Sequence, residues 1–236
     1  MTKIPPSATP LAGHGSAADS SLGGAGILRL SGFALVLSGL LAGAAAVLQA
    51  TAWPPSTSAG LPMWVDAHHA TLALIDECLV IGAALLAVGV VGMWQGLNAR
   101  SRPWAAAGVA LMALSAPVSV VDGVIYGRLT YPAYGIDVAG DPQALALVIT
   151  TWAGGAHAVS LILAVAGLAI GAGMICDRAR NTLLGALGLA AGITQLLVAF
   201  PWLFPVAAVT GCQLVLTVWL VTLGASLSAR TRLSLV

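Results

Sequence analysis

The sequence predicts an all-α fold, a polytopic membrane helix bundle with six transmembrane helices and both termini cytoplasmic. Of its 236 residues, 59% are apolar and only 7% are charged, whereas a soluble domain carries about 25% charged residues. Long charge-free runs cover residues 30–65, 78–99, 103–121, 142–176 and 181–229. Because one membrane-spanning helix needs about 20 apolar residues, lipid is the expected solvent for most of the exterior.

The charge-free runs divide into helices in chain order. The last run holds two spans, because residues 200–205 combine two prolines with aromatic side chains that favour a membrane interface. Strands are not expected, since runs such as residues 80–88 are apolar on every side and lack the alternation of a barrel strand. The expected helices cover residues 27–50, 65–97, 103–127, 142–175, 181–200 and 206–228.

Three regions follow from this division. Residues 1–26 are rich in Pro, Ser, Gly and Ala and are predicted to be a disordered N-terminal tail. Residues 27–228 form the six-helix transmembrane domain, and residues 229–236 form a cytoplasmic C-terminal tail. In an alternative interpretation, the first apolar segment is a signal peptide that is cleaved near residues 50–52, an A-x-A pattern.

Basic residues set the expected orientation, because cytoplasmic loops carry an excess of Lys and Arg. Only Arg128 falls on the opposite side of a six-span map from the other eight. The loops at 51–64, 128–141 and 201–205 are therefore expected outside. The eight cytoplasmic residues are Lys3, Arg29, Arg100, Arg102, Arg178, Arg180, Arg230 and Arg232.

Several classes of partner and chemistry are excluded or disfavoured. A net charge of +1 gives no basic surface for nucleic acid. Cys78, Cys176 and Cys212 form no CxxC pair and are expected to be buried thiols. Repeated GxxxG spacings predict close helix contacts. Among them are Gly39 with Gly43, Gly92 with Gly96, Gly167 with Gly171, and Gly188 with Gly192.

Ionisable residues at membrane depth indicate a functional pocket. Counting about 20 residues from the cytoplasmic helix ends places Asp76, Asp122 and His157 at one level near the outer boundary of the hydrocarbon. Such residues usually face a bundle interior and pair with something, so a polar pocket that opens outward is expected. Its candidate pocket or proton-relay residues are Asp76, Asp122, His157, His69, Tyr126, Gln195 and Gln213.

The residue types in this pocket suit three chemistries. Imidazole and carboxylate groups together can form a proton relay, an acid and base pair, or a metal site. The metal hypothesis names a divalent ion on His69, Asp76, Asp122 and His157. No HExxH, GxSxG or Walker motif occurs, so no catalytic residue is assigned. A purely structural role, such as His157 as a strut between helices, is the competing interpretation.

The last hairpin resembles the ending of a known group of proteins. Residues Leu183-Leu184-Gly185-Ala186-Leu187-Gly188-Leu189-Ala190-Ala191-Gly192, followed by Val218-Trp219-Leu220-Val221-Thr222-Leu223-Gly224, are similar to small six-span bacterial integral membrane proteins of unknown function. The resemblance covers about a fifth of the chain. It implies a bacterial inner-membrane location and assigns no catalytic residue.

The leading functional hypothesis is a membrane protein that binds or transports a small ligand with proton coupling. One alternative is an integral-membrane enzyme that acts on a hydrophobic or lipid substrate by acid and base or metal-assisted chemistry. Another is an accessory membrane subunit. The expected partners are the lipid bilayer, a small-molecule or lipid ligand, and a second copy of the chain or another membrane protein.

Overall fold

The computed structural model describes residues 16–98, 103–176 and 182–233, and in these ranges the chain is helical with no β-strand. This confirms the predicted all-α class. The elements, in order, are α1 (Ser16–Thr51), η1 (Ser58–Gly60), α2 (Leu61–Asn98), α3 (Pro103–Gly127), α4 (Pro142–Cys176), α5 (Thr182–Val198), η2 (Pro201–Leu203) and α6 (Val206–Leu233).

Five helices in the described chain are long and apolar enough to cross a membrane. They lie within α1, α2, α3, α4 and α6, while α5 is apolar but has only 17 residues. Large apolar side chains such as Phe33, Leu147 and Leu183 are exposed on the surface of the bundle. An exterior of this kind is expected where lipid replaces water as the solvent. The chain is therefore a helical membrane-embedded protein.

The helix ends lie close to the predicted ones except at the two ends of the bundle. Helix α1 begins at Ser16, inside the segment predicted to be a disordered tail, and α6 continues to Leu233, inside the predicted C-terminal tail. Adding a residue to an existing helix is far easier than nucleating one, so both spans extend beyond their apolar parts. Residues 1–15 and 234–236 of the predicted tails lie outside the described residues.

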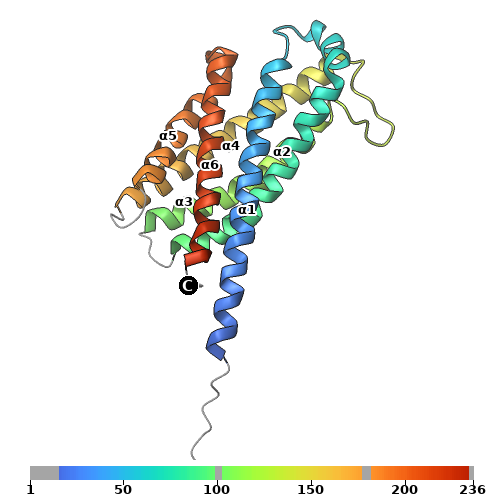
Figure 1. Ribbon diagram of the computed structural model, residues 1–236. Helices are drawn as coiled ribbons and strands as arrows, with labels where there is room; N and C mark the ends of the chain where they lie inside the picture. Colours follow the sequence, from blue (N-terminus) through green and yellow to red (C-terminus); the bar gives the residue numbers. More distant parts are fainter. Residues whose placement is uncertain (1–15, 99–102, 177–181, 234–236) are drawn as a thin grey trace, which may run out of the picture.

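The six helices form a closed ring in chain order (Figure 1). Each helix packs against the next one along the chain, and α6 packs back against α1. We call the end of the ring that carries the connections 52–60, 128–141 and 199–205 the loop end. The opposite end, where α1 begins and α6 finishes, is the terminal end (Figure 1).

Small residues form the closest helix contacts, as the GxxxG spacings predict. A Cβ added at Gly167 of α4 would lie 3.0 Å from the backbone N of Gly192 in α5. One added at Gly224 of α6 would lie 2.5 Å from the backbone O of Gly32 in α1. Only glycine allows two backbones to approach so closely. The α4–α5 contact and the α6–α1 contact that closes the ring therefore depend on these positions.

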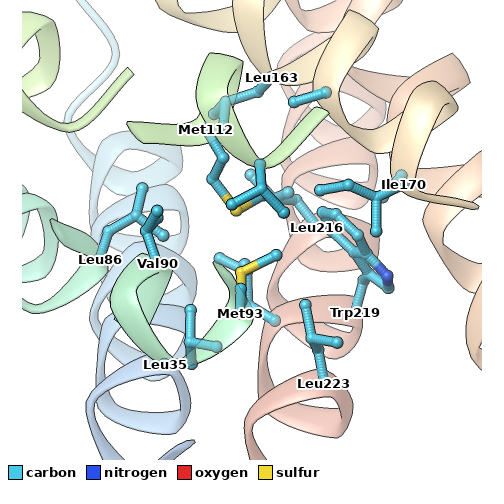
Figure 2. Packing of buried hydrophobic residues seen from close by; sticks show 14 of the residues in the cluster. Leu35, Leu86, Val90, Met93, Met112, Leu163, Ile170, Leu216, Trp219 and Leu223 are labelled. Carbon is cyan, nitrogen blue, oxygen red and sulfur yellow. The ribbon is translucent and has the colours of Figure 1, made fainter. Parts of the chain in front are cut away.

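The apolar core fills the ring toward its terminal end (Figure 2). Met93 of α2 and Met112 of α3 lie near its centre, and Trp219 of α6 is fully buried beside them. Helix α1 contributes Leu35 and α4 contributes Ile170. Every helix of the ring supplies at least one residue to this cluster. The core therefore joins all six helices on the terminal-end side of the polar residues.

A second apolar cluster lies at the loop end. It joins the start of α2, the end of α3, the 128–141 connection and the start of α4, with Leu72, Tyr126, Leu129 and Leu145 at its centre. Helices α2 and α4 each have more than 30 residues, which is longer than a membrane requires. Their additional turns pack together with the 128–141 connection at the loop end and extend the bundle beyond the ring.

Candidate functional site

A central cavity of about 150 Å³ lies inside the ring, on the loop-end side of the core. Leu86, Leu163, Leu216 and Leu220 belong both to the cavity wall and to the core, so they form the cavity floor. All six helices contribute to the wall. Its polar residues are Ser38 and Gln49 of α1, Cys78 of α2, Ser119 and Asp122 of α3, Ser160 of α4, Gln195 of α5 and Gln213 of α6.

Asp122 is the charged residue on this wall. Its side chain is only 7% exposed, and its Oδ1 atom has no hydrogen-bond partner among the described residues. The carboxylate packs directly on Gly155 of α4, where a Cβ would collide with it. Helical spacing places Ser115, Ser119 and Tyr126 on the same side of α3 as Asp122, and this side lines the two pockets. A glycine on α4 therefore leaves room for a buried carboxylate.

Asp76 occupies a different position from the one predicted. It is 8% exposed and packs on Gly127, five residues beyond Asp122 along α3. At 1.5 Å per residue this contact lies roughly 7 Å closer to the loop end. Its Oδ1 atom is also buried without a hydrogen-bond partner among the described residues. The structure therefore buries two carboxylates between neighbouring helices at successive levels and places Asp122 on the cavity wall.

The two candidate glutamines meet on the cavity wall. Gln195 is 1% exposed, and its Nε2 donates a hydrogen bond of 3.2 Å to Oε1 of Gln213. A buried amide requires such a partner, because an unsatisfied one costs several kcal/mol in an apolar medium. The pair therefore links α5 to α6 and also provides polar atoms on that side of the cavity wall.

His157 lies outside the cavity wall. Its Nδ1 is 2.6 Å from the backbone O of Ala199, and its ring contacts those of Phe200 and Trp202 at centroid distances of 5.0 and 6.1 Å. These contacts join the middle of α4 to the turn between α5 and α6. In the structure, His157 therefore makes the contacts expected of a residue that links helices, as the purely structural interpretation predicts.

Asp66, His69 and Asp76 form a polar stripe on one face of α2, and this stripe extends beyond the ring. His69 is exposed, and Asp66 is also exposed, although His69 and Asp76 are seven residues apart on one face. Seven residues correspond to about 10 Å along a helix, which places His69 where no neighbouring helix covers that face. His68 is half-buried, with Nδ1 2.9 Å from the backbone O of Trp64. Neither histidine lines the central cavity.

The structure does not gather the four residues of the metal hypothesis. Within residues 16–98, 103–176 and 182–233 no group of three or more His, Cys, Asp or Glu side chains is placed to hold one ion. His69 is exposed, His157 contacts Ala199, and the two aspartates lie at successive levels. The described residues therefore give the divalent-metal hypothesis no coordination sphere.

A smaller pocket of about 10 Å³ adjoins the central cavity toward the loop end. Gln49 and Trp152 line both spaces. Tyr126, Trp53 and Trp64 line the small pocket but not the central cavity. The rings of Tyr126 and Trp152 lie 4.9 Å apart. Aromatic side chains therefore occupy the region between the central cavity and the loop end.

Charged groups on the loop-end connections have their own partners. The Arg128 guanidinium donates hydrogen bonds to the backbone O atoms of Tyr131 and Ile136 at 2.7 and 3.1 Å. It therefore stabilises the 128–141 connection to which it belongs. The Tyr131 hydroxyl donates to Oε1 of Glu77 at 3.5 Å. Partial loss of hydration, together with the negative charges of Glu77 and Asp76, raises the pKa of the Tyr131 phenol.

Sequence reasoning missed several wall residues. Ser38 donates a 2.8 Å hydrogen bond to the backbone O of Gly82, and Gln49 and Trp152 separate the two spaces. The signal for Ser38 and Gln49 is their position as polar residues in an otherwise apolar first span. Trp152 gives no comparable signal, because tryptophans near the membrane boundary most often mark the interface.

Comparisons with protein families, curated proteins and solved structures gave no match for this chain.

Proposed function

We propose that this chain is a multi-pass plasma-membrane protein that binds a small ligand in the central cavity, entered from outside, with proton exchange at Asp122. The proposal includes six spans with both termini cytoplasmic. Eight of the nine basic residues fall, by sequence, before Leu30, between α2 and α3, between α4 and α5, or at and after position 230, and this distribution supports that orientation. Helix α5, at 17 residues, is about 25 Å long. With its turn it approaches the roughly 30 Å hydrocarbon thickness. The bacterial inner membrane is the location that the hairpin resemblance implies.

The observation that carries the proposal is the buried carboxylate of Asp122 on the wall of a cavity enclosed by six helices. A buried charge without a partner is costly, and intramembrane ionisable groups usually mark substrate or proton pathways. A stable bundle does not need an aspartate at this position. The negative charge of Asp122 would be compensated by a bound proton or a bound ligand.

The groups around Asp122 make a proton or a ligand the expected source of compensation. From α2, Cys78 lines the same cavity, and Asp76 packs on Gly127. Tyr126 lies one turn further along α3, and His157 on α4 contacts Ala199. None of the described wall residues is Lys, Arg or His, so no fixed cation balances the carboxylate there.

The packing favours access from the loop end. The core closes the cavity toward the terminal end through the four floor leucines, whereas the small pocket beside Gln49 and Trp152 extends toward the loop end. Passage across the membrane would require the core to open. Binding from outside is therefore the part of the transport hypothesis that this geometry supports best.

The test is the pH dependence of thermal unfolding in purified protein. The ionised form of a buried carboxylate without a partner is the unfavourable one, so the wild type should lose stability as the pH rises above the ordinary carboxylate range of about 4. Asp122→Asn removes one of the two such carboxylates, the other being Asp76, and should make this loss smaller. Asp66→Asn is the matched control, because Asp66 is exposed. An unchanged profile in Asp122→Asn would refute proton exchange at this residue.

A further inference from the structure

We infer that the ligand of the central cavity is a small organic monocation, an alkylammonium with about five heavy atoms, held by Asp122 against Trp152. This inference rests on the proposed function and specifies the chemical class of its ligand. Three features of the wall lead to it: its charge, its volume and the predominance of apolar side chains.

The charge of the wall is negative. Asp122 is its charged side chain, and the remaining polar groups are neutral hydroxyl, amide and thiol groups. Arg128 is occupied by its own loop carbonyls, so it does not supply a counter-charge. At membrane depth an anion with no fixed cation attracts a mobile one. A ligand with one positive charge would balance the wall, whereas an anionic ligand would be repelled.

The volume limits the size of the ligand. A cavity of about 150 Å³ is the size that accommodates a benzene-sized molecule. This excludes lipids and sugars as fully enclosed ligands and leaves room for a small branched amine or a quaternary ammonium ion. The Gln195–Gln213 hydrogen bond fixes the far side of the wall, so the cavity is bounded on that side by a rigid pair.

The apolar wall distinguishes an organic cation from an inorganic one. Sodium, potassium and calcium ions need several oxygen ligands around a single point, whereas Asp122 is the one carboxylate on the described wall and the Gln195 and Gln213 amides bond to each other. Most of the wall consists instead of Ala, Leu, Val and Gly. These groups suit the alkyl part of an ammonium ion, and an indole such as that of Trp152 is the best aromatic partner for its charge.

Thermal unfolding with three probes tests this ligand class directly. Tetramethylammonium chloride is compared with tert-butanol, which is similarly branched but uncharged, and with potassium chloride at equal ionic strength. A ligand that binds only the folded protein raises Tm in a saturable way. We expect such a rise with tetramethylammonium and no saturable rise with the other two probes.

Variants then assign the effect to the cavity. Asp122→Asn should weaken the apparent tetramethylammonium affinity by at least about tenfold, which corresponds to about 1.4 kcal/mol. Asp66→Asn removes the same charge from the exposed surface of α2 and should leave the affinity unchanged. Trp152→Leu keeps an apolar wall without the indole and should also weaken binding. The wild-type comparison of the three probes remains decisive if a variant does not fold.

Each contrary result has a distinct meaning. An equal rise with tert-butanol would show an apolar cavity without cation selectivity, and an equal rise with potassium would show an inorganic cation site. Both results overturn the organic monocation and leave the proposed function standing. No rise with any probe also overturns this inference. The proposed function then fails as well only if the pH profile of Asp122→Asn matches that of the wild type.

Discussion

At the scale of single residues, the site depends on glycines that leave room for a buried carboxylate on the neighbouring helix. Asp122 packs on Gly155 and Asp76 packs on Gly127, in both cases across a helix contact. A Cβ at either glycine would occupy the space of the carboxylate. The sequence places both aspartates at membrane depth, but the glycines opposite them could not be paired with them before the rotation of each helix was known.

Adding one methyl group tests this packing at Asp122. Gly155→Ala forces the Asp122 carboxylate to move and should lower stability by about 1–3 kcal/mol through overpacking. Gly154→Ala is a matched control, because a Cβ there would have no neighbour within 4 Å. Thermal or denaturant unfolding of both variants in detergent gives the comparison. Equal stability of the two variants would contradict the contact between α3 and α4.

Tyr131 provides a pH-dependent test outside the membrane spans. The neighbouring carboxylates disfavour the phenolate, so they contribute to the raised pKa of this residue. Glu77→Gln removes one charge and one acceptor, and the pKa of Tyr131 should move down toward the ordinary value of about 10. Alkaline titration of phenolate absorbance, with Tyr131→Phe to assign the signal, measures the change. Asp137→Asn is the control, and a rise after Glu77→Gln would oppose the prediction.

At the scale of elements, His157 shows how a functional candidate becomes a structural link. The sequence places it beside two carboxylates, since all three lie about one span from a cytoplasmic helix end. The structure turns its Nδ1 toward the carbonyl of Ala199 and stacks its ring near Phe200 and Trp202. Depth can be counted from sequence, whereas the direction in which a side chain points depends on the packing of the neighbouring helices.

Replacement of this histidine should weaken the link between α4 and the α5–α6 turn without changing the ligand site. His157→Ala leaves a carbonyl unpaired and should cost about 1–3 kcal/mol, while His157→Gln can retain a hydrogen bond and should cost less. Tetramethylammonium affinity should stay the same in both variants. A large loss of affinity, or a changed pH profile in His157→Gln, would restore the relay hypothesis for this residue.

The same limit explains which parts of the fold were predictable. Helix α4 and the start of α3 agree with the charge-free runs, because one charge at the bilayer centre costs at least about 2.5 kcal/mol. The inward face of α3 also agrees, since Ser115, Asp122 and Tyr126 repeat at helical spacing and are all buried. The stripe on α2 did not predict burial, because His69 shares a face with Asp76 but lies beyond the covering helices.

At the scale of the whole molecule, the ring and the distribution of basic residues together predict a topology. Reporter fusions after Arg102, Arg180 and Arg232 should report a cytoplasmic location, and a fusion within residues 130–140 should report an outside location. The even number of spans requires both termini on one side. A cytoplasmic result after Arg180 with an outside result after Arg232 would mean that α5 does not span, and a cytoplasmic result within 130–140 would invert the map.

Closure of the ring by its first and last helices also affects how the protein is assembled. Helix α6 supplies Gln213 and two floor leucines, so the cavity has no complete wall until the end of synthesis. Before that point, Ser38 on α1 and Gln195 on α5 lack α6 beside them. The contact between Gly32 and Gly224 then closes the ring and completes the cavity wall. Mutations at these two glycines should reduce the yield of inserted protein, while the assembled molecules should keep their ligand affinity.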